Sequence, residues 1–357
     1  MKNSINKFLF ALIILGCSLQ VFSQQDEQIS QAQKIANDFL VEEQIPGMAI
    51  SVSKGGKLIW TEGFGFMDVE NNIKVDPPTT QFRIASISKT LTAMGMGVLA
   101  DDNKLDFDAS LYTYVPDFPK KKYDFTLRQT AGHVAGIRHY NGNEFQLNKK
   151  MNIVEGLAIF KDDPLLFEPG SKYKYSTYGW NLLSVVVQNA ANQEFNQFMQ
   201  KKVFKPLKMK STEVGISDMD IPNRTKFYIK RGGKAIIAPQ VNNEFKVAGG
   251  GFISTSEDLA KFGEEFINPE LVSKSTIKDL TTSLKTSDGK STNYGVGIRV
   301  NTVGENTLRY SHSGGGMGAS TFIAIYPEKD MVICVLTNLS GANVRKLVGE
   351  LEGMFVL

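Results

Sequence analysis

Cysteine is scarce in this sequence of 357 residues, which contains only Cys17 and Cys334. Cys17 lies in the N-terminal leader, and Cys334 lies in an apolar segment, 331–336, whose pattern predicts a strand. Once the leader is removed or lipidated, no disulfide can form within the chain, so the hydrophobic core alone must stabilise it. We expect Cys334 to be a buried, inert thiol.

Histidine is also rare, with three residues in the whole chain. His133 and His139 lie near each other in the sequence, but they lack a third ligand and a His-Glu-x-x-His helix. A metal-dependent hydrolase is therefore disfavoured. We expect no metal and no other cofactor.

The chain lacks a strong charge of either sign. Its formal net charge is +3, and removal of residues 1–23 would take away Lys2 and Lys7 but no acidic residue, leaving +1. Basic residues do not cluster among aromatic ones, so the electrostatic requirement for nucleic-acid binding is not met. We expect no nucleic-acid partner.

The N-terminus has the pattern of a targeting segment. Lys2 and Lys7 precede an apolar run, 8–16, that is too short to span a bilayer. We predict a signal peptide over residues 1–23 and an exported protein, periplasmic or secreted. Two alternatives are a lipoprotein, cleaved before a lipidated Cys17, and an uncleaved membrane anchor. A lipid anchor at Cys17 is the only membrane attachment that we expect.

The remaining chain, 24–357, reads as one domain without repeats or linkers. Strand patterns lie near both of its ends and helix patterns lie between and beyond them. The predicted strands are 48–52, 57–60, 308–312, 321–326 and 331–336, and the main predicted helices are 28–43, 178–198 and 344–354. This order predicts an α/β (α+β) fold, in which N- and C-terminal segments form a sheet flanked by helices and the middle forms an inserted, mainly helical lobe. A ligand is expected in the cleft between the lobes.

One stretch places a serine and a lysine at the start of a long apolar helix pattern. Ser86 and Lys89 are three residues apart, so their side chains share one face of a helix. The helix N-terminus supplies positive potential, which together with partial burial should lower the pKa of Lys89. A neutral amine beside a serine hydroxyl can accept its proton, as in serine acyl-transfer enzymes. Ser86 is therefore the candidate nucleophile and Lys89 its base.

The spacing alone is a weak signal, because a serine three residues before a lysine occurs at five other places. These are Ser4/Lys7, Ser51/Lys54, Ser171/Lys174, Ser275/Lys278 and Ser287/Lys290. Only Ser86 opens a long apolar helix pattern, which we expect to be amphipathic. The alternative for Ser86 is a simple helix N-cap.

Two further elements complete a candidate site. Tyr175 and Thr177 lie where a helix begins, and a tyrosine beside the serine can act as or assist the general base. His312, Ser313, Gly314 and Gly315 follow a predicted strand, and the glycines let a substrate lie against its edge. The N–H groups of Ser86 and Gly315 would form an oxyanion hole. The alternatives are a packed tyrosine, a surface histidine and a flexible glycine loop.

Together these elements resemble the serine β-lactamase and penicillin-binding-protein superfamily, and most closely its class C β-lactamase-related hydrolases. The branch with the mitochondrial serine β-lactamase-like protein is the most similar. The resemblance covers the chain from about residue 30 onward. It rests on Ser86-Ile87-Ser88-Lys89, Tyr175-Ser176-Thr177 and His312-Ser313-Gly314, with support from Phe82-Arg83-Ile84-Ala85, Gly136-Ile137, Glu168-Pro169-Gly170 and Gly249-Gly250-Gly251-Phe252. It implies a β-lactamase/transpeptidase-like fold and a catalytic set of Ser86, Lys89 and Tyr175.

The sequence departs from the pattern of this superfamily at two motif positions. Thr177 stands where asparagine is usual, and its hydroxyl is shorter than an amide. His312 stands where lysine is common, and a neutral imidazole holds a substrate carboxylate less well. Both departures favour a peptidase, amidase or esterase over efficient β-lactam hydrolysis.

The leading hypothesis is an exported serine hydrolase that acts on a small peptide, amide or ester through an acyl-enzyme. In this hypothesis Thr177, His312, Ser313, Gly314 and Gly315 bind the substrate or its oxyanion. The alternative is a penicillin-binding-type sensor or binding protein that is acylated with little turnover.

Overall fold

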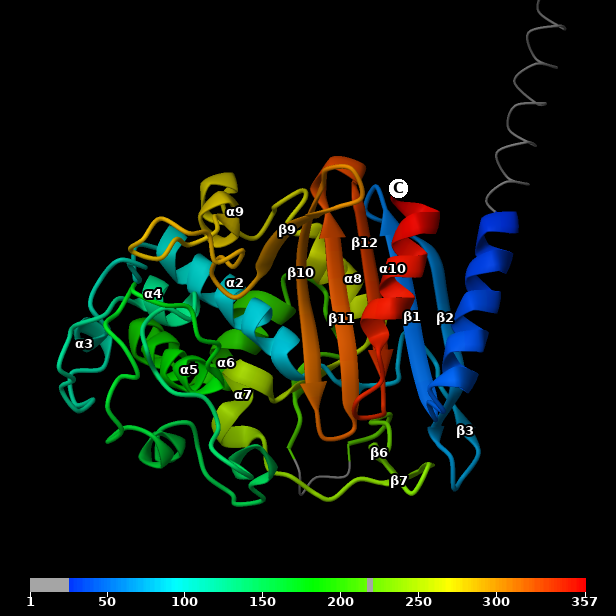
Figure 1. Ribbon diagram of the computed structural model, residues 1–357, viewed down its shortest axis with the longest axis horizontal. Helices are drawn as coiled ribbons and strands as arrows, with labels where there is room; N and C mark the ends of the chain where they lie inside the picture. Colours follow the sequence, from blue (N-terminus) through cyan, green and yellow to red (C-terminus); the bar gives the residue numbers. More distant parts are fainter. Residues whose placement is uncertain (1–25, 217–220) are drawn as a thin grey trace, which may run out of the picture.

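A seven-stranded antiparallel sheet forms one half of the computed structural model, which describes residues 26–216 and 221–357 (Figure 1). Its strand order is β3-β2-β1-β12-β11-β10-β9. The bounds are β1 Gly47–Lys54, β2 Lys57–Asp68, β3 Ile73–Lys74, β9 Arg299–Val303, β10 Thr307–Gly316, β11 Ala319–Tyr326 and β12 Met331–Thr337. The two ends of the domain therefore supply the whole sheet, as predicted, although β3 and β9 were not among the five predicted strands. The predicted signal peptide and Cys17 lie outside the described residues.

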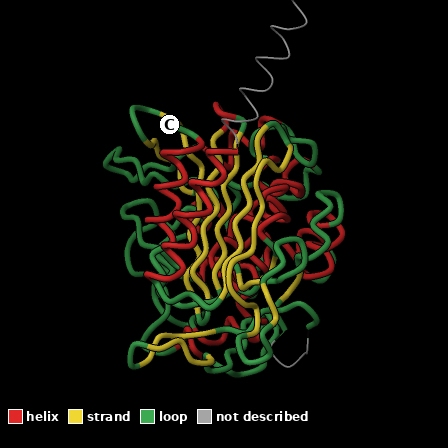
Figure 2. Tube along the Cα trace, turned by 90° about the vertical axis from the view of Figure 1, so that its right-hand side faces the viewer, coloured by secondary structure: helices red, strands yellow, loops and turns green. Residues whose placement is uncertain are grey.

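Helices cover both faces of this sheet (Figure 2). A helix over residues 26–42 and α10 (Val344–Phe355) pack on one face, and α8 (Ser256–Glu264) packs on the other. Alternation along β11 shows the division, because Phe322 contributes to the core under α10 while Ile323 belongs to the core shared with the helical lobe. The sheet is thus buried on both sides, and its register is fixed by two hydrophobic layers.

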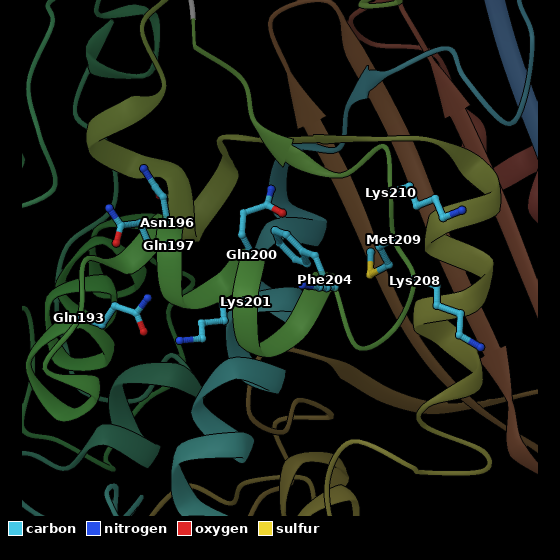
Figure 3. A pocket seen from close by; sticks show the side chains of 10 residues that line it. Gln193, Asn196, Gln197, Gln200, Lys201, Phe204, Lys208, Met209 and Lys210 are labelled. Atoms are coloured by element: carbon cyan, nitrogen blue, oxygen red, sulfur yellow. The ribbon is translucent and has the colours of Figure 1, made fainter.

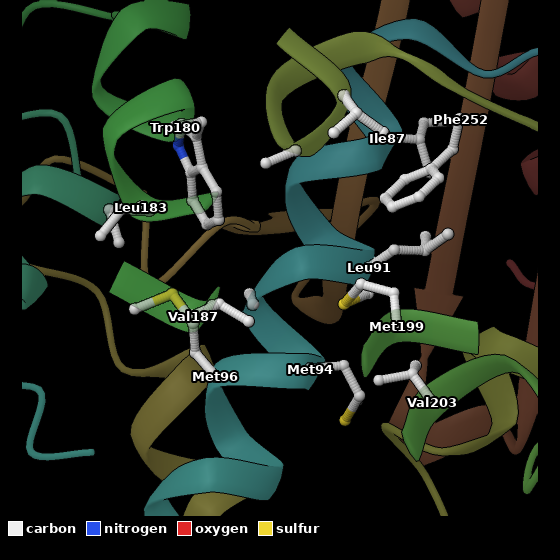
Figure 4. Packing of buried hydrophobic residues seen from close by; sticks show 14 of the residues in the cluster. Ile87, Leu91, Met94, Met96, Trp180, Leu183, Val187, Met199, Val203 and Phe252 are labelled. Atoms are coloured by element: carbon white, nitrogen blue, oxygen red, sulfur yellow. The ribbon is translucent and has the colours of Figure 1, made fainter. Parts of the chain in front are cut away.

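The second half of the structure is a helical lobe built around α2 (Ser88–Asp101) (Figure 4). Every residue of α2 from Ser88 to Leu99 is buried, so the predicted amphipathic character is wrong and the helix is a central core element. Glycine allows this packing, because a Cβ at Gly95 would lie 2.7 Å from the Met199 sulfur. The other helices are α3 Leu111–Tyr114, α4 Leu127–Ala131, α5 Thr177–Ala191, α6 Phe195–Met199, α7 Val247–Gly250 and α9 Lys274–Thr281.

Shorter elements complete the structure. The bounds of the remaining strands are β4 Phe82–Arg83, β5 Glu213–Val214, β6 Tyr228–Arg231, β7 Lys234–Ile237 and β8 Phe252–Ser254. Those of the 3₁₀-helices are η1 Ala85–Ile87, η2 Glu144–Gln146, η3 Glu155–Ile159, η5 Glu244–Lys246 and η6 Pro327–Lys329, and η4, Gln200–Phe204, is a π-helix. Strands β4 and β8 pair in a small sheet with β5, which fixes the chain just before Ser86.

Three predicted boundaries are wrong. The helix predicted over 178–198 is two helices, because Asn192 adopts a left-handed conformation (φ 47°) and ends α5. The strand predicted over 57–60 continues to Asp68, since pairing with β1 persists to Gly65 and pairing with β3 follows. The strand predicted to end at His312 likewise continues to Gly316 by pairing with β11.

A close backbone approach at Gly314 joins the sheet to the segment that carries Ser86. A Cβ at this position would lie 2.1 Å from Thr321 Oγ1 and 2.2 Å from the carbonyl oxygen of Ile84. The Thr321 hydroxyl donates a hydrogen bond of 3.0 Å to the same Ile84 oxygen. Only glycine at 314 lets β10 and η1 pack this closely.

We therefore predict that Gly314→Ala destabilises the fold by about 1–3 kcal/mol, the usual cost of overpacking a tight site. The thermal unfolding midpoint measures this change. Gly349→Ala is the matched control, because Gly349 lies in α10 with no atom within 4 Å of the added Cβ, and its midpoint should stay equal or rise. Equal midpoints for the two variants would contradict the tight contact at Gly314.

Candidate active site

Ser86 lies in η1, directly before α2, where the backbone is unusual. The preceding residue, Ala85, has a φ of 46°, in the left-handed region that costs a non-glycine residue of order 1 kcal/mol. Pairing of β4 with β8 on one side and the Gly314 approach on the other hold the chain in this conformation. Ser86 is only partly buried, because its side chain lines a cavity.

Lys89 is completely buried and lies beside Ser86. Its Nζ is 3.2 Å from Ser86 Oγ and 3.2 Å from Thr177 Oγ1, and it donates a 2.5 Å hydrogen bond to the carbonyl oxygen of Gly249. Burial lowers the pKa of Lys89 well below its usual value, and the positive charge of Lys246 lowers it further. The sequence had pointed to the helix N-terminus and partial burial as causes. In the structure the first cause is full burial, and the second is the charge of Lys246.

This set of contacts fits a neutral amine. A neutral Lys89 can donate to the Gly249 carbonyl and the Thr177 hydroxyl while its lone pair accepts the hydrogen bond from Ser86. Glycine at 249 makes the short contact possible, since a Cβ there would lie 2.6 Å from Thr177 Cγ2. The glycine run that begins at Gly249 thus helps to position the base, a role that the sequence did not reveal.

Tyr175 precedes α5 and contacts both residues. It is hydrogen-bonded to Ser86, and its ring centroid lies 4.9 Å from Lys89 Nζ. Burial raises the pKa of Tyr175, although the hydrogen bond to Ser86 acts in the opposite direction. The phenol is therefore protonated at neutral pH and can pass a proton on, while Lys89 is the better resting base.

Two histidines hold the N-terminus of α5, which carries Tyr175 and Thr177 into the site. His133 Nδ1 accepts a hydrogen bond of 3.1 Å from the Ser176 N–H, and His139 Nδ1 accepts one of 3.1 Å from the Thr177 N–H. Burial lowers the pKa of both imidazoles, that of His139 to about 4. Both are thus neutral, with the remaining proton on Nε2.

The sequence raised these two histidines only as weak metal ligands. In the described part of the chain, no three side chains of His, Cys, Asp or Glu come together as a candidate metal site. Their helix-capping role depends on residues more than 35 positions apart in the sequence, and no local pattern indicates it.

Only part of the third predicted element, residues 312–315 of β10, lines the cavity. Gly315 lines the cavity, and β9 pairs with β10 only as far as Ser311, so the edge of β10 beyond it is not covered by β9. His312 is buried, with Nε2 2.8 Å from the Tyr294 hydroxyl and Nδ1 2.8 Å from the Ser313 carbonyl oxygen. It does not line the cavity.

Ser313 points to the opposite face of the sheet. It pairs with Phe322, which belongs to the core under α10, and its Oγ accepts a hydrogen bond of 2.9 Å from Arg345 Nη2. Gly314 serves the packing against Ile84. The predicted substrate contacts of the His312 and Ser313 side chains therefore find no support in this arrangement, whereas that of Gly315 fits the cavity.

The cavity itself has a volume of about 220 Å³ and brings together four of the predicted residues: Ser86, Tyr175, Thr177 and Gly315. The other lining residues are Arg83, Ala85, His139, Tyr140, Phe145, Val241, Asn243, Lys246, Gly249, Gly250, Gly316, Met317 and Ala319. Sequence reasoning missed Arg83, His139 and Lys246 as lining residues. Arg83 counted only as motif support for the family resemblance, and the distances of His139 and Lys246 from Ser86 along the chain do not form a motif.

A larger groove of about 880 Å³ lies over α6 and η4 (Figure 3). Its lining includes Phe204, Met209 and four lysines, Lys201, Lys205, Lys208 and Lys210, but it shares no residue with the cavity at Ser86. It contains no paired nucleophile and base. The smaller cavity is therefore the candidate active site.

Comparison with known proteins agrees with this fold. The Beta-lactamase family model matches residues 26–351. Human serine beta-lactamase-like protein LACTB, mitochondrial, is 31% identical over an alignment of length 380 that covers 80% of this chain and 69% of that protein.

Two solved structures share the fold at low sequence identity. D-amino acid amidase from Ochrobactrum anthropi SV3 superposes with a TM-score of 0.80 at 18% identity, covering 92% of this chain and 98% of its own. EstCE1, described as a hydrolase with promiscuous acyltransferase activity, superposes with a TM-score of 0.78 at 18% identity, covering 93% and 99%. The extent of the family match and the similarity to LACTB show that this chain belongs to the Beta-lactamase family and has the β-lactamase/transpeptidase-like fold.

Proposed function

We propose that this protein is a serine hydrolase that cleaves a small peptide, amide or ester through an acyl-enzyme on Ser86. One observation carries the proposal: the amine of Lys89, fully buried and with a lowered pKa, lies 3.2 Å from the Ser86 hydroxyl. A base in contact with a hydroxyl that opens into a cavity is the minimal arrangement for nucleophilic catalysis.

Acylation follows from these contacts. Ser86 Oγ attacks the carbonyl carbon of the substrate while its proton passes to Lys89 Nζ. The backbone N–H groups of Ser86 and Gly315 stabilise the oxyanion. Tyr175 relays the proton to the leaving nitrogen or oxygen, the bond from the carbonyl carbon to that atom breaks, and Ser86 keeps the acyl group as an ester.

Deacylation uses the same residues in reverse. Water attacks the acyl ester and gives one proton to the Lys89 and Tyr175 pair. The tetrahedral intermediate then collapses, the carboxylic acid leaves, and the proton returns to Ser86 Oγ. The net reaction consumes one water and forms one acid and one amine or alcohol.

The residues around Ser86 favour peptides, amides or esters over β-lactams. Thr177 presents a hydroxyl that already contacts Lys89. His312 lies beside Tyr175, with ring centroids 6.4 Å apart, and both of its ring nitrogens contact other protein groups. Neither position therefore offers the amide or the ammonium group with which the superfamily usually holds a β-lactam. The names of the two structural neighbours, an amidase and a hydrolase with acyltransferase activity, are consistent with acyl transfer from such donors.

An acylated sensor is the second candidate function. The cavity has no Asp or Glu among its described lining residues, so a deacylating water has only Lys89 and Tyr175 to activate it. If this activation is slow, the protein would be acylated with little turnover. Acyl-enzyme that accumulates and persists would distinguish this function from hydrolysis.

Export from the cytoplasm is part of the proposal and rests on the sequence of residues 1–23. Across residues 26–216 and 221–357, the structure has no helix with the length and apolar character needed to cross a bilayer. The human relative is named as mitochondrial. Fractionation of cells that express the full chain, with N-terminal sequencing of the mature protein, would decide between cleavage after residue 23 and lipidation at Cys17.

We predict that a fluorophosphonate labels Ser86 alone. Intact-protein mass spectrometry should show one adduct on the wild type and none on Ser86→Ala, because the Ser86 hydroxyl contacts a buried amine and also opens into the cavity. Ser287→Ala is the matched control, since Ser287 has the same spacing to Lys290 but lies exposed, and it should keep the adduct. An adduct on folded Ser86→Ala would contradict the assignment.

We also predict that Lys89→Met lowers kcat/KM by about 10²–10⁴-fold, the usual contribution of general base catalysis, with the fold retained. In the wild type, kcat/KM should rise with pH, because acylation needs neutral Lys89 and the neutral fraction grows as pH passes its lowered pKa. Steady-state kinetics over the pH range in which the fold is stable test both points. Lys290→Met, which changes the exposed Ser287/Lys290 pair, should leave the pH profile of kcat/KM unchanged. A Lys89→Met variant that also keeps the wild-type profile would contradict the assignment of Lys89 as the base.

A further inference from the structure

Two cationic side chains, Lys246, which is buried, and Arg83, which is partly buried, line the cavity at Ser86 without an acidic partner. Lys246 is 4% exposed and belongs to η5, and Arg83 belongs to β4, two residues before Ala85. Within the described residues, no carboxylate forms an ion pair with either side chain and none lines the cavity. Burial of an unpaired charge is costly, so their presence beside the nucleophile calls for a functional reason.

The contacts of Lys246 leave part of its ammonium group unused. Nζ donates one hydrogen bond of 2.8 Å to the carbonyl oxygen of Phe145, and the rings of Tyr140 and Phe245 lie 5.2 Å from it. An ammonium has three donors, so two remain for a ligand. Burial, with the charge of Arg83, lowers the pKa of Lys246 to about 7, and a bound anion would favour the charged form again.

Arg83 adds a second cation at the same cavity. Its Nη1 donates to the carbonyl oxygen of Met317 at 2.8 Å, and its guanidinium lies 3.8 Å from the ring centroid of Phe227. These contacts fix the side chain without neutralising it. The negative charge of Glu144 acts on His139, which lines the cavity, but Glu144 is itself paired with Arg138 at 2.7 Å.

From this arrangement we infer that the substrate carries a carboxylate, which Lys246 binds while Ser86 attacks the scissile carbonyl and Arg83 adds positive potential. The inference rests on the proposed serine hydrolase function and narrows its substrates to anionic peptides, amides or esters. Lys246 is then a specificity residue. A rival role for Lys246 is to lower the pKa of Lys89 by charge repulsion alone. The two roles predict different rates for neutral substrates relative to charged ones.

Matched esters separate these roles. The first pair is the mono-4-nitrophenyl ester of adipic acid and the same ester of adipamic acid, which differ only in a terminal carboxylate against a carboxamide on the acyl side. The second pair is the butyrate esters of 4-hydroxybenzoate and 4-hydroxybenzamide, with the same difference on the leaving group. The readout is the ratio of kcat/KM for the charged over the neutral member. A partly inactive preparation does not change this ratio.

We expect wild type to prefer the charged member of at least one pair by about tenfold, the scale of one charge-assisted hydrogen bond. Lys246→Met should bring that ratio close to one, and Arg83→Met should lower it in part. Lys201→Met is the matched control, because it removes one lysine charge from the remote groove over η4, and its ratio should equal that of wild type.

Two results would overturn the inference. One is a wild-type ratio near or below one for both pairs. The other is a ratio that Lys246→Met leaves unchanged while it slows both members equally, which would assign Lys246 to tuning Lys89. If no ester is cleaved in a Ser86-dependent manner, the proposed function itself fails, and the inference fails with it. Neutral esters cleaved without any charge preference would overturn the inference alone.

Discussion

The burial of Lys89 is the constraint on which the site depends. An ammonium group at this depth is unfavourable, and no carboxylate of the described residues pairs with it, so the protein lowers the pKa of the amine instead. The neutral amine then needs acceptors and a donor. Gly249 and Thr177 supply the acceptors, and the Ser86 hydroxyl, 3.2 Å from Nζ, can turn its proton toward the lone pair of the neutral amine. The packing of the core is therefore the reason that Lys89 is neutral and can accept the Ser86 proton.

That packing draws three distant segments to one point. The first turn of α2 is held by the small sheet and by the glycine contact at Gly314, α5 is held by His133 and His139 at its N-terminus, and α7 approaches through Gly249. Each contact joins residues far apart in the chain. The sheet matters to the chemistry mainly as the rigid support that places β10 against η1, which fits the view that precise sites are built on rigid elements.

Much of this could be predicted from the sequence where the signal is local. Ser86 and Lys89 are one helical turn apart, and the strand patterns near the two ends of the chain predict the sheet. The orientation of β10 could not be predicted in the same way. Strand alternation places His312 and Ser313 on opposite faces, and the partners of each, Tyr294 and Arg345, come from other elements. Their predicted substrate roles came from motif likeness, and tertiary packing decided their surroundings.

The residues missed by the sequence, Lys246 and His139, have no local pattern because their roles depend on burial. Lys89 and Lys246 show how two lysines near one cavity can have different roles. Lys89 has contacts with three protein groups and no room for a ligand, so its neutral form is useful as a base. Lys246 has one protein acceptor and faces the cavity, so its charged form is useful to a ligand. A bound carboxylate would also screen the repulsion between the two lysines, and would thereby raise the basicity of Lys89 when the substrate is in place.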